Sequence, residues 1–179
     1  MRAGVILHRP RWNYLLDVEY APGFRGWGDI SGQSLHHFFY GLRPELRYAL
    51  KGNGAAKGTL QPFISLEVPI NYLETVIDGG RYTAASGEYI AFDRGVRHRE
   101  RVSVLAKYTL AATVARHWYL EGYVGGGAAY RKNYYTRMSN VRPGNEFLED
   151  YEWRFGASPR EGAGWVLDLA LGVRIGYRL

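Results

Sequence analysis

The final segment of the chain, residues 165–179, alternates without a break between two kinds of residue. One set is Trp165, Leu167, Leu169, Leu171, Val173, Ile175, Tyr177 and Leu179, and the other is Val166, Asp168, Ala170, Gly172, Arg174, Gly176 and Arg178. A helical period of 3.6 residues would scatter the apolar set around the helix axis. The segment is therefore predicted to be a β-strand with one fully apolar face, and it is much longer than the usual strand of about 5–6 residues.

The length of this strand matches a membrane crossing. A tilted β-strand spans a bilayer with about 9–11 residues and carries aromatic side chains at the interfaces. Trp165 and Tyr177 lie near the two ends of the apolar set, as interfacial residues would. The chain contains no apolar run close to the roughly 18 residues that a transmembrane helix needs.

The same alternation recurs in five earlier segments, residues 12–20, 37–50, 60–72, 102–114 and 118–131, and residues 3–8 form a short apolar piece. The composition agrees, because 23 glycines suit tight turns and a crowded interior, and 15 tyrosines suit membrane interfaces. We therefore predict one domain over residues 1–179, an all-β, antiparallel up-and-down transmembrane β-barrel of about eight strands.

The connections between these segments alternate in length. Residues 9–11, 51–58 and 115–117 are short connections, and residues 22–34, 77–99 and 137–164 are predicted to be long loops. Short periplasmic turns and longer outer loops are typical of bacterial outer-membrane barrels. The short connections carry only cations, and we expect these to meet phospholipid head groups: Arg9, Arg11, Lys51, Lys57 and Arg116.

Charged residues fall on the strand face opposite the apolar set. Six are acids and six are bases: Asp17, Glu19, Glu45, Glu67, Glu121 and Asp168, with Arg43, Arg47, Arg101, Lys107, Arg131 and Arg174. Unpaired charges inside a narrow barrel would cost free energy, so the matched set predicts a network of ion pairs. A barrel of about eight strands is only wide enough for side chains to fill, which predicts a plugged lumen. The predicted lipid-facing residues include Trp118, Leu120, Val124, Leu169, Leu171 and Val173.

Three short motifs resemble a known family. They are Trp-Asn-Tyr-Leu-Leu-Asp at residues 12–17, Arg-Pro-Glu-Leu-Arg-Tyr at residues 43–48, and the segment from Arg116 to Gly127. They look like a domain-of-unknown-function family of small Bacteroidetes outer-membrane proteins, some of them linked to fimbrial gene clusters. The resemblance implies an eight-stranded barrel without catalytic residues. The chain departs from the family pattern before the last strand, where a Gly-Pro-Thr is replaced by Phe155-Gly-Ala-Ser-Pro159.

A few residues of the chain are compatible with catalysis or metal binding. His98, in the predicted loop 77–99, is close in sequence to Asp93 and Glu100, and Ser86 is not far off, so a barrel protease or lipid A hydrolase with its site in the outer loops is an alternative. The His36–His37 pair lacks the nearby acids of a metal site. We therefore predict no catalytic residue, no metal and no cofactor.

The glycine triplet and the charge of the chain have simple interpretations. Gly125-Gly126-Gly127 is not followed by a helix-forming run, which favours close packing in a barrel over phosphate binding. The net charge of +6 could suit nucleic acid, but the basic and aromatic residues fall on opposite strand faces. The expected partners are outer-membrane lipid and, in an anchoring or assembly role, a protein of the cell envelope. A soluble lipocalin-like barrel, with its apolar face inside, is a further alternative.

With the short piece at residues 3–8, the predicted strands number seven, whereas bacterial single-chain barrels normally have an even number of strands. Residues 2–8 also lack the features of a secretory signal. We therefore expect a further strand upstream of Met1. Residues 147–155 are the alternative source of an eighth strand.

Overall fold

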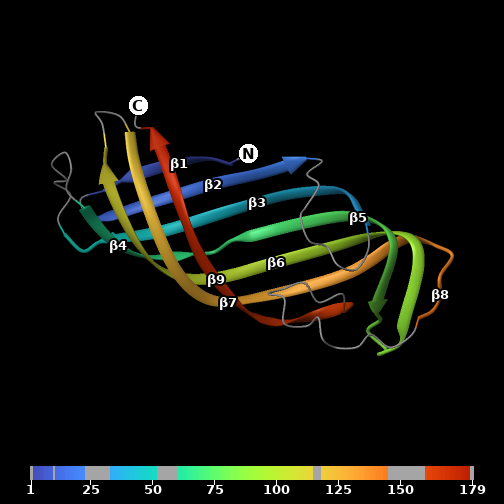
Figure 1. Ribbon diagram of the computed structural model, residues 1–179. Helices are drawn as coiled ribbons and strands as arrows, with labels where there is room; N and C mark the ends of the chain where they lie inside the picture. The colour runs from blue at the N-terminus through green and yellow to red at the C-terminus, as the bar shows by residue number, and fades with distance from the viewer. Residues whose placement is uncertain are drawn as a thin grey trace.

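The computed structural model describes residues 2–9, 11–22, 33–51, 60–114, 118–144 and 160–177, and these form one nine-stranded antiparallel sheet (Figure 1). The strands are β1 (Arg2–His8), β2 (Trp12–Pro22), β3 (Gln33–Ala49), β4 (Leu60–Glu67), β5 (Ile70–Thr83), β6 (Tyr89–Thr113), β7 (Trp118–Ser139), β8 (Arg142–Pro143) and β9 (Gly162–Tyr177). The predicted all-β, antiparallel class is confirmed. No helix in the described residues is long and apolar enough to cross a membrane.

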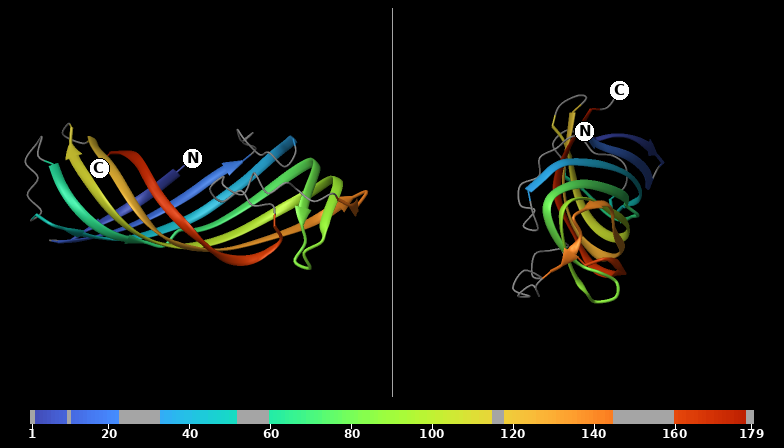
Figure 2. Two further views of the ribbon diagram at one scale, coloured as in Figure 1. Left: turned by 60° about the horizontal axis from the view of Figure 1, so that its bottom comes forward. Right: turned by 90° about the vertical axis from the view of Figure 1, so that its right-hand side faces the viewer.

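The strands pair in sequence order, and the sheet curls strongly (Figure 2). The order is β1-β2-β3-β4-β6-β7-β9, with β5 also lying between β3 and β6. β1 and β9 stand at the two ends of this order, with no pairing between them in the described residues. Outward side chains on these two edge strands are more exposed than one on an inner strand. Leu171 on β9 is 85% exposed and Val5 on β1 is 70% exposed, whereas Leu120 on β7 is 41% exposed. Closure of the sheet into a barrel stays a prediction.

β4 and β5 are two parts of one strand line, interrupted at Val68 and Pro69. Both strands pair with β3 on one side and β6 on the other. Pro69 has no N–H to donate, but its carbonyl accepts a hydrogen bond from the Ser103 N–H at 2.9 Å. The Val68 N–H donates to the Pro44 carbonyl at 2.9 Å. β3 itself runs through Pro44, so the alternation predicted across that proline is preserved.

The predicted long loop at residues 77–99 is wrong, because β5 and β6 continue through it as a hairpin. They pair as far as Thr83 and Tyr89, and the chain turns at residues 84–88. Gly79 has a φ of 67°, and the register of β5 with β6 is the same before it, at Asp78–Arg94, and after it, at Gly80–Phe92. The buried residues of β5 are Thr75 and Ile77 before this point and Gly80 and Tyr82 after it, so the inward positions change from odd to even numbers. The sequence alternation is therefore lost although the strand continues.

The projecting hairpin has a small core of its own. Together with the end of β7 and β8 it forms the extension, which we define as residues 77–96 and 134–144 and which lies at one end of the sheet (Figure 1). Phe92 is 1% exposed and packs with Ile77, Tyr82 and Tyr135. The rings of Tyr82 and Tyr135 stack with centroids 4.1 Å apart. Burial in this core raises the pKa of the Tyr82 hydroxyl.

The other predicted strands begin or end a few residues from their predicted limits. β7 is the main exception, because it runs to Ser139 instead of residue 131, so the predicted loop 137–164 begins inside a strand. Residues 147–155, Lys57 and Arg116 lie outside the described part of the chain. The hairpin connection at Arg9 and Arg11 is partly described, and there the Arg9 N–H donates to the Trp12 carbonyl at 2.8 Å.

Candidate functional site

The candidate site is the inner face of the curled sheet, where the predicted charged residues lie. Along β2, along residues 101–110 of β6 and along most of β7, more exposed and less exposed residues alternate, so each of these stretches presents one set outward and one set inward. The six residues predicted to face lipid are all exposed on the outer face: Trp118, Leu120, Val124, Leu169, Leu171 and Val173. Inward, Glu67, Arg47 and Lys107 are at most 4% exposed.

Aromatic pairs bound the apolar band of the outer face. Near the extension, Tyr40 and Tyr72 are cross-strand neighbours with ring centroids 4.8 Å apart. Tyr130 and Trp165 are paired on β7 and β9 at 5.5 Å. At the opposite end, equivalent pairs are Trp12–Tyr48 at 4.9 Å and Trp118–Tyr177 at 5.2 Å. The outer surface is thus an exposed aliphatic band with Tyr and Trp at both edges.

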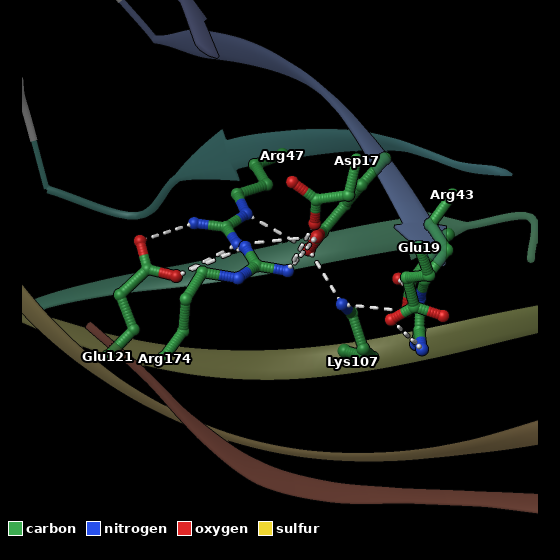
Figure 3. Close-up of polar contacts among 9 residues, drawn as sticks. Asp17, Glu19, Arg43, Arg47, Lys107, Glu121 and Arg174 are labelled. Atoms are coloured by element: carbon green, nitrogen blue, oxygen red, sulfur yellow. Dashed lines mark hydrogen bonds and ion pairs between the residues drawn. The ribbon is translucent and has the colours of Figure 1, made fainter. Parts of the chain in front are cut away.

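Arg47 on β3 is the centre of the inner charge network (Figure 3). Its Nε donates to Glu45 Oε1 at 3.0 Å, two residues away on the same face. Its Nη1 and Nη2 donate to the two oxygens of Glu121, at 2.7 and 3.0 Å. Glu121 belongs to β7, so this bidentate pair crosses the interior of the sheet. All three side chains are buried, where a charge without a partner would be costly.

Lys107 extends the network to β4. Glu45 and Glu67 lie directly opposite each other on β3 and β4, an arrangement that is unfavourable for like charges. The Lys107 ammonium lies between them, 3.0 Å from Glu45 and 2.8 Å from Glu67. Arg43 adds a second cation to Glu67, at 2.6 Å, and also reaches Glu19 at 3.3 Å.

Arg174 ties the last strand to the second. Its Nη2 lies 3.0 Å from Asp17 Oδ2 on β2, and its Nη1 lies 3.3 Å from Glu121. The Asp17 carboxylate lies over Gly4 of β1, in space that any side chain at Gly4 would need. The ion pair between Arg174 and Asp17 thus links β9 with β2, near the two ends of the strand order, through side chains instead of backbone hydrogen bonds.

A second group of charges lies toward the extension. Arg101 forms an ion pair with Asp168 at 2.5 Å, and Arg131 lies directly opposite Arg101 on β7. Arg97 and Arg99 continue the same inner face of β6. They were missed because they were assigned to the loop 77–99, so the predicted set of inward bases is incomplete. The alternation of Arg97, Arg99 and Arg101 was the signal that could have placed them.

His98 does not meet the residues that its sequence position suggested. It lies in β6, not in a loop, with Nδ1 2.5 Å from the Tyr72 hydroxyl and Nε2 2.7 Å from the Thr136 hydroxyl. Asp93 instead accepts hydrogen bonds from Asn140 and Arg142, at 2.8 and 2.6 Å. These two donors hold the pKa of the Asp93 carboxyl below its usual range.

The remaining chemical candidates form structural contacts. His37 Nδ1 lies 3.0 Å from the Thr75 hydroxyl. Within the described ranges, no three His, Asp or Glu side chains gather as metal ligands would. A Cβ on Gly125 or Gly127 would collide with the backbone of β6, so these glycines allow close strand packing. Comparison with known proteins found no matching family model, no matching curated protein and no matching solved structure.

Proposed function

We propose that the protein is an integral bacterial outer-membrane β-barrel with a structural, anchoring or assembly role and a lumen plugged by charged side chains. The observation that carries the proposal is the outer surface, an aliphatic band bounded at both edges by paired aromatic side chains. In water this band would be a large exposed apolar surface, and soluble monomers rarely have one. A bilayer core with its two interfaces fits the band and its aromatic edges.

The inner charge network supports the same proposal. A soluble lipocalin-like barrel would place apolar side chains inside to hold a ligand. Here ion pairs link the inward Arg47, Glu45, Glu121 and Lys107, while most of the large apolar side chains are exposed on the outer face. Interior space filled by paired charges leaves little room for solutes to pass, which favours an anchoring role over diffusion.

Spin labels on single-cysteine variants test the orientation of the two faces, because the native chain has no cysteine. Labels at Val124 and Leu169, both outward, should be accessible to lipid-dissolved oxygen after reconstitution in bilayers. Labels at Ser103 and Thr109, both inward and almost fully buried, are matched controls and should be protected. Accessibility in the reverse order would refute the membrane assignment, and so would a native chain that stays monodisperse without detergent.

A further inference from the structure

An apolar groove crosses the outer face of the sheet near the extension, with a volume of about 540 Å³. One wall is an aliphatic row of cross-strand neighbours on β2, β3, β5 and β6: Val18, Leu42, Ile70 and Val102. The other wall is the next outward row, formed by Tyr40, Tyr72 and Glu100. Four adjacent strands span about 14 Å, and rows two residues apart on a strand are separated by about 7 Å. The groove is therefore long and narrow, as a site for an alkyl chain would be.

Hydrogen bonds hold the aromatic wall of the groove in place. The Tyr72 hydroxyl lies 2.5 Å from His98 Nδ1, and His98 Nε2 lies 2.7 Å from the Thr136 hydroxyl. The Tyr40 ring stacks on Tyr72, and the Tyr134 ring stacks on His98 with centroids 4.7 Å apart. A wall that is already fixed loses little conformational entropy when a ligand binds, which favours binding.

Charged side chains lie at the β6 end of the groove. The Glu100 carboxylate is exposed and accepts a hydrogen bond from the Tyr134 hydroxyl at 3.4 Å. Lys132 is the cross-strand neighbour of Glu100 on β7, and its ammonium lies 5.7 Å from the centre of the Tyr134 ring. One carboxylate and one ammonium are therefore neighbours where the apolar groove ends. This arrangement complements a molecule with an alkyl chain and a head group that carries one charge of each sign.

We propose that the groove binds phosphatidylethanolamine, with an acyl chain between the two rows, the lipid ammonium at Glu100 and the lipid phosphate at Lys132. This inference rests on the proposed membrane location, since the lipid would reach the groove from the bilayer. The primary ammonium of ethanolamine has N–H groups that can donate to a carboxylate, whereas the trimethylammonium of choline has none. Any lipid chain can cover the rest of the apolar band, so preference for the ethanolamine head group is what distinguishes this site.

Native mass spectrometry of the full chain in a neutral detergent tests the head-group preference. The two probes are dioleoyl phosphatidylethanolamine and dioleoyl phosphatidylcholine, which have the same acyl chains. Wild type should bind the ethanolamine lipid about tenfold more tightly, the effect of one hydrogen bond to a charged group. Glu100→Gln should abolish this preference. Glu88→Gln is the matched control, because it makes the same charge change in the exposed turn of the β5–β6 hairpin, and it should keep the preference.

A second pair of variants tests the groove itself. Val102→Phe places a ring in the groove and should weaken binding of the ethanolamine lipid. Val124→Phe is the control, because Val124 is similarly exposed on the outer face of β7 but does not line the groove, and binding should be unchanged. Equal binding of the two lipids by wild type would overturn the proposal, as would the same loss in either control variant. The spin labels decide the membrane assignment separately, so lipid-exposed labels without a head-group preference would refute the site alone.

Discussion

Glycines on β7 determine how closely the charged strands approach. Gly125 lies opposite Lys107, and a Cβ there would strike the Ala106 carbonyl and the Lys107 side chain. Gly127 lies opposite Leu105, and a Cβ there would strike the Val104 carbonyl. Because the obstacles include backbone atoms of the paired strand, they cannot move aside as the end of a side chain can.

Gly127→Ala should therefore destabilise the fold, by about 1–3 kcal/mol, as overpacking does. Gly122→Ala on the same strand is the control, because a Cβ there has no described atom within 4 Å. Denaturant unfolding in detergent, followed by tryptophan fluorescence, compares the two. Equal stability of the two variants would show that β6 and β7 are not as close as described.

Glu121→Gln should lower the free energy of unfolding more than Glu100→Gln does. The carboxylate holds both Arg47 and Arg174, and it is 3% exposed. Its neutralisation takes the charged partner from the bidentate pair with the buried Arg47, and breaking a buried ion pair typically costs about 3–5 kcal/mol. Glu100→Gln is the control on the exposed outer face. The same denaturant titration measures both, and a loss below 1 kcal/mol (roughly the value of an exposed pair) would contradict the buried network.

At the scale of elements, alternation predicted strands wherever the pleat is regular. Residues 165–177 kept their alternation and form the greater part of β9. The prediction failed at Gly79 and Gly80, because the buried positions of β5 change from odd to even numbers there although the strand continues. The positive φ of Gly79 is a backbone conformation that a pattern of apolar and polar residues does not reveal. The charged face could be predicted for the same reason as the strands, whereas the partner of each charge depends on the curl of the sheet.

The extension should unfold separately from the rest of the sheet. Phe92→Ala removes the most buried ring of its core, and Phe→Ala changes in cores cost about 3–5 kcal/mol. Hydrogen exchange should speed up across residues 77–96 and stay unchanged across residues 102–113. Val141→Ala, at an exposed position of the extension, is the control. Uniformly faster exchange over β6 would show that the extension and the sheet unfold together.

At the scale of the whole molecule, the charge network predicts electrical behaviour. Ion pairs between inward side chains connect β2, β3, β4, β6, β7 and β9, and we predict that these side chains plug the lumen. Single molecules in a planar bilayer should therefore show conductance far below that of an open porin. The double variant Glu45→Ala with Arg47→Ala, which shortens two central side chains, should raise the conductance. A large steady conductance from the native chain would contradict the plugged interior.

The pair between Asp17 and Arg174 joins residues 157 positions apart. Such a contact can form only after most of the chain is in place, since closing long loops is slow and costs entropy. Interactions that form after the transition state do little for the folding rate but slow unfolding. The ion pair would then slow unfolding and lengthen the lifetime of the folded protein without speeding its folding.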